Sequence, residues 1–388
     1  MTRKCNGSAY AGTILAAAIL FLTISFQPTF AAEPINIGLT TDFSGMASTY
    51  AVQEAPVIEW VVKEVNAAGG INGRPINLII QDNGSDPAKA VGNVKMFKEQ
   101  YHCKAIIMGV TSTVGVALKA WGEKNHLPII TMDSASDRLW DKTGESWFFR
   151  TEVPTSLRIL AALDRMKKLG YTKVAFEGST LAWGTDALTV VKERASDYGI
   201  TLVAVSLIEP KTKDLTIQAK QLKDSGAQAV ICAEYEAEGG VFARAMKQIE
   251  WNPYVFHVSA ANYVNTLEMY PPELFEGWET VMTIDRTKPL VRKIWEKTKA
   301  YTGKNPIEDE KCPRSYDAIN LLIEALKASG NPEDSTAIRD AFYKLSNYER
   351  ATGKQGGKGG FGVGRNHLLD ISDLVSYTTK AGKLVPVK

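Results

Sequence analysis

The sequence predicts an α/β protein with two lobes, each built on a doubly wound parallel sheet. Short runs rich in β-branched residues alternate along the chain with amphipathic stretches of helical period. Repeated strand–helix units of this kind form parallel sheets with helices on both faces. The alternation begins again after Trp147–Arg150, and 388 residues are enough for two domains of ordinary size. Two such series in tandem therefore indicate two lobes.

The first series of predicted elements opens with a strand at Ile35–Leu39. A helix follows at Val52–Asn66, where the valine and isoleucine residues fall on one face. Another helix is predicted at Pro87–Tyr101, because Asp86 suits the N-cap position and proline suits the first turn. The remaining elements of this series are strands at 76–80, 105–108 and 129–132 and a helix at 114–124.

The second series repeats this pattern between residues 156 and 258. Its predicted helices cover 156–169, 185–198, 215–225 and 238–249, and its strands cover 174–176, 202–206, 229–233 and 254–258. Beyond Met282 we expect three helices, near 289–301, 315–328 and 336–346, and then two strands, around 374–379 and 384–387.

The loops that follow the parallel strands are the predicted ligand-binding segments. In doubly wound sheets, ligands bind beyond the carboxyl ends of the strands. These loops are rich in Gly, Ser, Thr, Asn and aromatic residues, and they cover residues 40–50, 109–114, 132–137, 177–184, 233–239 and 258–263.

The N-terminus has the layout of a secretory signal peptide, which we place at residues 1–31. The basic pair Arg3-Lys4 precedes an apolar run over 9–26, and small residues around Ala31 suit cleavage before Ala32. A single membrane anchor is the alternative interpretation, although the run is at the short end for a bilayer span. We therefore expect an exported, periplasmic protein that is free of the membrane after cleavage.

Charge and cysteine content exclude several classes of protein. A net charge of +2 gives no indication of a nucleic-acid partner. Three cysteines remain after cleavage, and they permit at most one intramolecular disulfide; we favour buried free thiols. Their spacing matches no zinc motif. These three cysteines are Cys103, Cys232 and Cys312.

No constellation typical of an enzyme is found. The four histidines are far apart in sequence, and no zinc-protease, nucleophile-elbow or P-loop motif occurs. The segment Gly357–Gly362 satisfies G-x-G-x-x-G, but a polar stretch precedes it instead of a strand, so a flexible loop explains it. The carboxylates of Glu234, Glu236 and Glu238 suit the positive end of a helix. We expect no catalysis, no cofactor and no metal.

Several segments, taken together and in order, resemble those of one protein family. By these segments the chain resembles the branched-chain amino-acid (Leu/Ile/Val-type) binding proteins, which are receptors of ABC importers with the type I periplasmic-binding fold. The resemblance covers essentially all the mature chain. The matching segments are 37–45, 66–75, Asp82, 85–87, 109–112, 150–156, Trp183-Gly184 and 315–318.

This resemblance implies how the lobes are divided. The first lobe takes residues 33–150 and 283–368, and the second takes 151–282 and 369–388. A hinge of three strands lets the lobes close over a ligand, which drives closure by touching both of them. We expect a monomer that binds one small molecule and docks to a membrane permease.

On the first lobe the resemblance implies a polar cradle for a carboxylate. By resemblance, Ser112 is the serine that binds the ligand carboxylate, at a predicted helix start where hydroxyls and free backbone N–H groups suit an anion. An ordinary helix cap is the compatible alternative. The residues that we expect to contact the ligand from this lobe are Tyr50, Ser112, Thr113, Asp133, Ser134 and Ala135.

On the second lobe we expect ligand contacts from Trp183, Tyr235, Glu236 and Asn262. Family members that bind amino acids place a carboxylate after the strand 254–258, where it holds the ammonium group. No acid is present in the corresponding segment of this chain. Because a buried ammonium without a counter-charge is costly, either another acid replaces it or the ligand lacks an ammonium group.

The expected function is therefore capture of a small carboxylate with an aromatic or bulky apolar body. The acids that could replace the missing one are Asp133 and Glu236. A branched-chain amino acid, an amide or urea is the alternative ligand, and a ligand sensor for a membrane regulator is the alternative role.

Overall fold

Two separate sheets of mainly parallel strands organise the chain. The computed structural model describes residues 1–2 and 33–387, without the side chains of 260–262. The first sheet has the strand order β2-β1-β3-β4-β5, and all of its neighbouring strands are parallel. Its strands are β1 (Ile35–Thr41), β2 (Ile76–Asp82), β3 (Ala105–Met108), β4 (Ile129–Thr131) and β5 (Phe148–Arg150).

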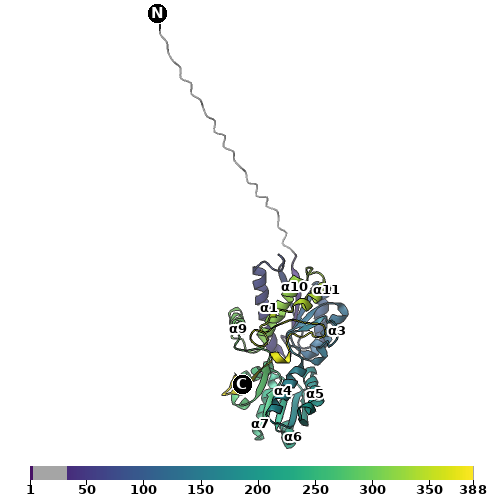
Figure 1. The fold of residues 1–388 in the computed structure, drawn as a ribbon, viewed down its shortest axis with the longest axis vertical. Coiled ribbons are helices and arrows are strands. Elements are labelled where there is room, and N and C mark those ends of the chain that lie inside the picture. The colour runs from purple at the N-terminus through teal and green to yellow at the C-terminus, as the bar shows by residue number, and fades with distance from the viewer. Residues whose placement is uncertain (3–32, 388) are drawn as a thin grey trace. The chain divides into compact units, whose positions relative to one another are not determined.

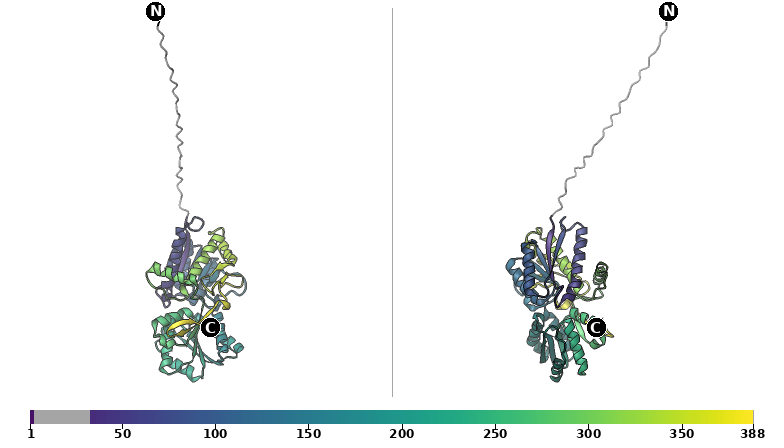
Figure 2. Two further views of the ribbon diagram at one scale, coloured as in Figure 1. Left: turned by 60° about the vertical axis from the view of Figure 1, so that its left-hand side comes forward. Right: turned by 180° about the vertical axis from the view of Figure 1, so that it is seen from behind.

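The second sheet has the order β14-β13-β10-β9-β8-β6-β7. Its strands from β6 to β10 are parallel, whereas β13 and β14 form an antiparallel edge beside β10. In both views of Figure 2 the C-terminal hairpin lies with this sheet. The strands are β6 (Lys173–Ser179), β7 (Thr201–Ile208), β8 (Ala229–Ala233), β9 (Tyr254–His257), β10 (Glu279–Met282), β13 (Val375–Lys380) and β14 (Lys383–Pro386).

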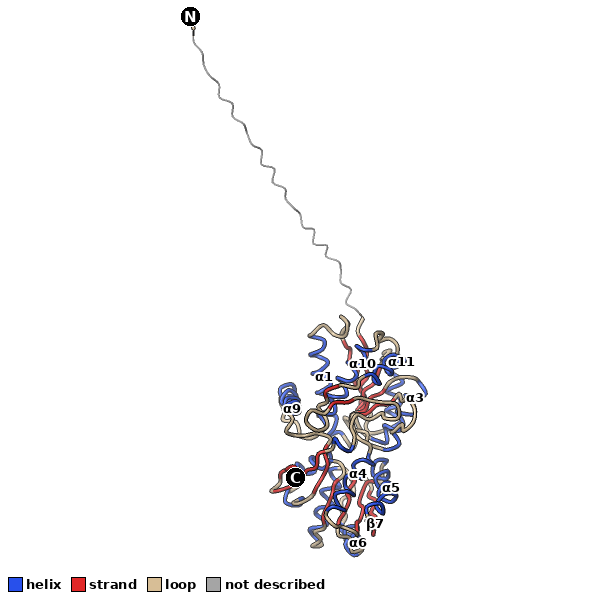
Figure 3. Tube along the Cα trace, in the orientation of Figure 1, coloured by secondary structure: helices blue, strands red, loops and turns tan. Residues whose placement is uncertain are grey.

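Each sheet has its own set of helices, so the predicted α/β architecture with two lobes is confirmed (Figures 1 and 3). We call the first sheet and its helices the first lobe, and the second sheet and its helices the second lobe. The first lobe has α1 (Ser48–Ala67), α2 (Pro87–Glu99), α3 (Ser112–Asn125), α9 (Pro289–Thr302), α10 (Lys311–Ala328) and α11 (Ser335–Lys344). The second has α4 (Thr155–Lys168), α5 (Ala182–Arg194), α6 (Thr216–Asp224), α7 (Glu236–Gln248) and α8 (Ala260–Met269).

Alternating burial along the strands places apolar residues on both faces of each sheet. In β3, Ala105 and Ile107 face α1 and α10, whereas Ile106 and Met108 face α2 and α3. Side chains of the second-lobe strands also alternate between two faces, with α4 and α5 packed on one face and α6, α7 and α8 on the other. Strands buried on both faces are expected of parallel sheets.

The described chain passes between the lobes three times: after β5, after β10 and before β13. The parallel bridge from Arg150 to His367 and that from Ile284 to Gly353 join these connections to each other and to the first lobe. The lobe boundaries that the sequence gives within these connections remain a prediction.

Local sequence explains several element ends. The Asp86 side chain accepts hydrogen bonds from the backbone N–H groups of Ala88 and Lys89, as predicted for the start of α2. Several predicted bounds were wrong. Helix α1 begins at Ser48, four residues before the predicted Val52, and the segment 258–263 is not a loop throughout, because α8 starts at Ala260. Alanine has the highest helix propensity, so the two alanines at 260 and 261 favour a helix directly after the strand.

The cysteine prediction is confirmed, since Cys103, Cys232 and Cys312 are buried free thiols. The predicted signal peptide falls on residues 1–31 and so lies almost entirely outside the described residues. Within the described part of the chain, no helix is both long and apolar enough to cross a membrane.

Candidate functional site

The strand ends of both lobes meet at a small internal cavity of about 40 Å³. Six of the residues predicted from the sequence line it: Tyr50, Ser112, Asp133, Ala135, Trp183 and Tyr235. The first four belong to the first lobe and the last two to the second, so the cavity lies between the lobes. These residues follow or flank the parallel strands, as expected for ligand-binding loops, and they meet at this cavity.

Three predicted residues lie outside the cavity wall, and the side chain of a fourth is not described. Thr113 is the second residue of α3 and is not in the cavity wall, and Ser134 is fully buried, with its hydroxyl donating to the Thr111 carbonyl. Glu236 lies at the start of α7 and is engaged by other side chains. The side chain of Asn262 lies outside the described residues. For all ten residues, ligand contact remains a prediction.

The start of α3 offers a hydroxyl donor to the cavity. Thr111 is the N-cap, and the Ser112 hydroxyl oxygen accepts hydrogen bonds from the N–H groups of Ala135 and Ser136, both at 3.1 Å. A hydroxyl has two acceptor sites and one donor proton. Because both acceptor sites are used by the protein, the Ser112 proton is left for an acceptor. A carboxylate oxygen at the positive end of α3 meets this requirement.

Aromatic side chains form the apolar part of the cavity. The rings of Trp183 and Tyr235 meet edge to face, with centroids 5.7 Å apart and planes at 83°. From the first lobe, Tyr50 is buried, and the Lys311 ammonium lies 4.4 Å from its ring centroid. Burial, followed by the charges of Glu236 and Asp133, raises the pKa of Tyr50, so its hydroxyl stays protonated.

Two arginines that sequence reasoning missed anchor a buried charge network beside the cavity. Arg158, in the first turn of α4, pairs with Glu152 at 2.9 Å and with Glu310 at 2.8 Å. Arg314, on α10, pairs with Asp133 and Glu152. All five side chains are almost fully buried, and buried charges persist where they are paired in this way.

The carboxylate of Asp133 is therefore already balanced by Arg314. A second group reinforces this. Burial, followed by the charge of Asp133, raises the pKa of Glu54 well above its ordinary value, so Glu54 is protonated. A protonated carboxyl can donate to its ionised neighbour, which satisfies an Asp133 oxygen that has no other partner among the described residues.

Hydrogen bonds link the two lobes on either side of the cavity. The Thr49 hydroxyl donates to Glu236 at 2.7 Å. On another side, Asp186 of α5 accepts from the Ser136 hydroxyl and from Arg138 Nε, the latter at 3.0 Å. Helix α3 also packs on α5. The structure therefore represents a closed arrangement of the lobes.

The remaining wall residues were not predicted as individual ligand contacts, although some of them lie in the predicted loops 109–114 and 258–263: Val110, Thr111, Glu152, Thr155, Arg158, Val258 and Ser259. One signal was available for the arginines. Arg158 recurs at helical spacing with the buried residues Thr155, Ala162 and Met166, so it interrupts the apolar face of α4. Arg314 likewise lies on the buried face of α10. A charged residue on a buried helical face needs a partner, and it therefore marks an internal site.

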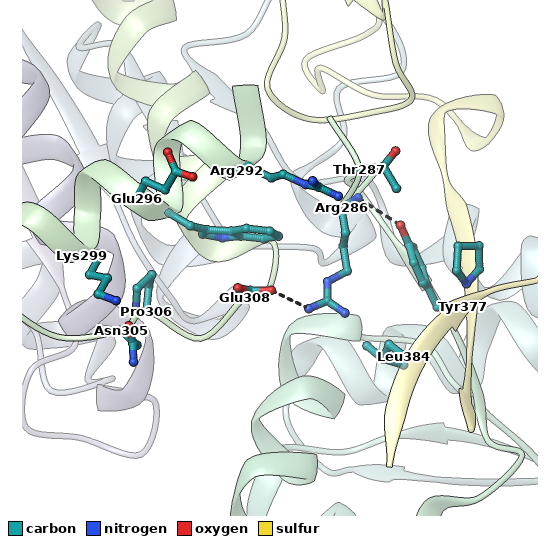
Figure 4. A pocket seen from close by; sticks show the side chains of 12 residues that line it. Arg286, Thr287, Arg292, Glu296, Lys299, Asn305, Pro306, Glu308, Tyr377 and Leu384 are labelled. Atoms are coloured by element: carbon teal, nitrogen blue, oxygen red, sulfur yellow. Dashed lines mark hydrogen bonds and ion pairs between the residues drawn. The ribbon is translucent and has the colours of Figure 1, made fainter. Parts of the chain in front are cut away.

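A larger pocket of about 600 Å³ lies elsewhere (Figure 4). It is formed by one face of α9, the loop at 305–308 and the C-terminal hairpin, and Arg286 in it pairs with Glu308 at 3.2 Å. Among the described residues it contains none of those predicted for ligand binding and no parallel strand end. The smaller cavity is therefore the candidate ligand site, since strand ends, hydroxyls and aromatic rings of both lobes converge there.

Comparison with known proteins agrees with this geometry. The model of a periplasmic binding protein family matches residues 34–367, which is most of the chain. The chain belongs to the periplasmic binding protein family. The resemblance predicted from the sequence is confirmed, and this periplasmic binding protein is a substrate-binding protein and not an enzyme.

Its curated relatives include Leu/Ile/Val-binding protein BraC3 of Rhizobium johnstonii, which is 24% identical over 95% of this chain and 97% of the relative. Leu/Ile/Val-binding protein homolog 3 of Brucella melitensis is also 24% identical, over 88% of this chain and 91% of the relative. The members of this family bind small molecules, work with ABC permeases and are periplasmic.

Solved structures share the fold at low sequence identity. A type 1 periplasmic binding protein from Bordetella pertussis superposes with a TM-score of 0.81, at 19% identity, covering 91% of this chain and 99% of that one. The substrate-binding protein LivJ from Streptococcus pneumoniae, solved in complex with isoleucine, has a TM-score of 0.75 at 19% identity, covering 91% and 100%.

Proposed function

We propose that this periplasmic binding protein captures a small carboxylate between its lobes and delivers it to the membrane permease of an ABC importer. The observation that carries the proposal is the Ser112 hydroxyl, whose acceptor sites are filled by Ala135 and Ser136 so that its proton can only be donated outwards. The ligand touches both lobes through Ser112 and Tyr235, and this differential contact drives closure.

The ligand body is aromatic or bulky and apolar. Trp183 and Tyr235 present an edge-to-face pair to the cavity, and Tyr50 stands on the other lobe. An ammonium group is not expected on the ligand, since both acids that line the cavity, Asp133 and Glu152, are already paired with arginines. A second cation beside Arg314 would be buried without a counter-charge of its own.

A second candidate ligand is a branched-chain amino acid. Asp133 lines the cavity and could exchange its present partner for an ammonium group, and the curated relatives are named for leucine, isoleucine and valine. An amide or urea would use the same hydroxyls without charge. A sensor that reports to a membrane regulator would bind its ligand in the same way. We expect the receptor to act as a monomer and without nucleic acid.

Isothermal titration calorimetry of the purified mature protein distinguishes these ligands. Benzoate-type acids, leucine and urea are titrated separately into protein that has been unfolded and refolded to remove bound solute. We expect one-to-one binding of an aromatic acid and no heat from leucine or urea. Tight leucine binding together with no response to aromatic acids would overturn the proposed specificity.

A further inference from the structure

A second cluster of polar side chains lies on the opposite face of the second sheet from Tyr235. It contains Glu177 of β6, Cys232 of β8 and Glu234 just beyond β8. The Cys232 sulfur and one oxygen of each carboxyl all lie within 4.8 Å of one another, and all three residues are fully buried. Nothing in the ligand cavity uses these groups.

The strand register explains why the three side chains converge. Glu177 is the parallel partner of Cys232, so both side chains leave the sheet on the same face. Glu234 follows Cys232 by two residues and therefore points the same way, towards α6, α7 and α8. Tyr235, one residue later, points to the other face and reaches the cavity.

The cluster has a polar neighbour that is aimed into it. His257 of β9 is the register partner of Cys232, is 1% exposed, and has its Nε2 3.7 Å from Glu234 Oε1. Its Nδ1 accepts a hydrogen bond from the Ser259 N–H, so the ring proton is on Nε2. That N–H has no hydrogen-bond partner among the described residues.

Two buried carboxyls side by side are costly unless something neutralises them. The close polar neighbour and hydrogen-bond partner of the Glu177 carboxyl is the Glu234 carboxyl. Without a cation the protein must hold protons here.

We propose that Glu177, Cys232 and Glu234 bind a divalent transition-metal ion of the Zn²⁺ class. One thiolate and two carboxylates supply three negative charges, which a divalent cation largely offsets. A thiolate ligand selects against Ca²⁺ and Mg²⁺, which take oxygen ligands and a larger coordination number. Ligand atoms so close together suit a tetrahedral ion with a small additional ligand such as water.

His257 orients the site without ligating the ion. The Nε2 N–H faces Glu234 at 3.7 Å, and with an ion bound it would donate to that carboxylate and orient it, as outer partners of metal ligands commonly do. The ion joins the ends of β6 and β8. It therefore fixes the turn that carries Tyr235 to the ligand cavity on the other face.

Cysteine spacing alone could not indicate this site, because its proposed ligands come from two segments of the chain and two of them are glutamates. Register between β6 and β8 is needed to see it.

Cobalt provides the direct test, because thiolate ligation to Co²⁺ gives a charge-transfer absorption in the near ultraviolet. The mature protein is stripped with a chelator and titrated with Co²⁺ at neutral pH, and then with Zn²⁺ in competition. We expect one equivalent of Co²⁺ with the thiolate band, displacement by Zn²⁺, and no displacement by Mg²⁺. Binding releases protons from the carboxyls and the thiol, which a weakly buffered titration records.

Three variants decide which residues are responsible. Cys232→Ser should lose the thiolate band, and Glu177→Gln should keep the band but bind Co²⁺ about 10- to 100-fold more weakly. Cys103→Ser, which alters another buried thiol, is the matched control and should behave as the parent protein. If Cys232→Ser does not fold, the weaker Co²⁺ binding expected of Glu177→Gln is the deciding measurement. Absence of stoichiometric binding, or a band that survives Cys232→Ser, would refute the site.

Discussion

At the scale of the residue, Ser112 performs two tasks that can be separated by experiment. Its hydroxyl oxygen accepts from the N–H groups of Ala135 and Ser136, and under the proposed function its proton is donated to the ligand. Replacing it with alanine removes both interactions. The two N–H groups then lose their acceptor inside the protein, and the ligand carboxylate loses a charge-assisted hydrogen bond.

We predict that Ser112→Ala weakens ligand binding about 10- to 100-fold and lowers the free energy of unfolding by about 1–3 kcal/mol. Calorimetric titration measures the first effect and urea denaturation the second. Ser329→Ala, at the far end of α10, is the control and should leave affinity unchanged. Reduced stability with unaltered affinity would make Ser112 a structural residue only.

His367 gives the protein a pH dependence that originates at a connection between the lobes. Burial, followed by the positive charge of Arg150, lowers the pKa of His367 to about 4. Since the folded protein holds this ring neutral, its contribution to stability is complete above pH 6.5 and is lost as the pH falls towards 4.

We predict that acidification from pH 7 to pH 5 costs the parent protein about 2 kcal/mol more than it costs His367→Gln. Urea unfolding of both proteins at the two pH values measures this difference. The exposed His102 serves as a control, because His102→Gln should retain the parent's pH dependence. Equal losses for the parent and His367→Gln would contradict the assignment.

At the scale of the element, the start of α5 fastens the second lobe to the turn at residues 136–138. Asp186 is 8% exposed and accepts from Ser136 and Arg138 of the other lobe. We predict that Asp186→Asn weakens ligand binding about tenfold by destabilising the closed arrangement, because it removes a charge-assisted hydrogen bond between the lobes.

The control for this variant is Asp224→Asn, which breaks an exposed pair with Lys220 within α6 and should leave affinity as it is. Calorimetry compares the two variants. An unchanged affinity for Asp186→Asn would show that this contact does not contribute to closure.

Helices and strands were predicted correctly from the sequence where neighbouring residues alone determine the structure. The cap at Asp86 and the alternation of strands and helices depend on neighbouring residues alone. It failed at α8 because the first residues of that helix were interpreted as the loop following a strand. Arg158 and Arg314 were missed for another reason: their partners Glu152, Glu310 and Asp133 come from distant segments.

At the scale of the whole molecule, contacts between lobes determine the site, and these depend on the folded arrangement. Thr49 and Glu236 are 187 residues apart in sequence yet hydrogen bonded. Ligand contact by Glu236 stays a prediction, and in the structure its carboxylate accepts hydrogen bonds from Thr49 and Asn265. Resemblance indicated residues of both lobes that the structure brings to one cavity, but it could not show that Arg314 balances Asp133.

The closed cavity of about 40 Å³ holds only a few water molecules, so a ligand of amino-acid size requires the lobes to separate before it enters. We predict that small-angle X-ray scattering records a larger radius of gyration without ligand than with it. For Asp186→Asn, the radius of gyration without ligand should be equal to or larger than that of the parent protein. A radius that is unaffected by saturating ligand would contradict closure by ligand.

A crystal structure of the protein with a bound benzoate-type acid tests the central claim most directly. We predict one molecule between the lobes, with its carboxylate on the Ser112 hydroxyl and the start of α3 and its ring against Trp183 and Tyr235. The Asp133–Arg314 pair should remain intact. A ligand bound in the pocket beside α9, or one whose polar group displaces Arg314 from Asp133, would contradict the claim.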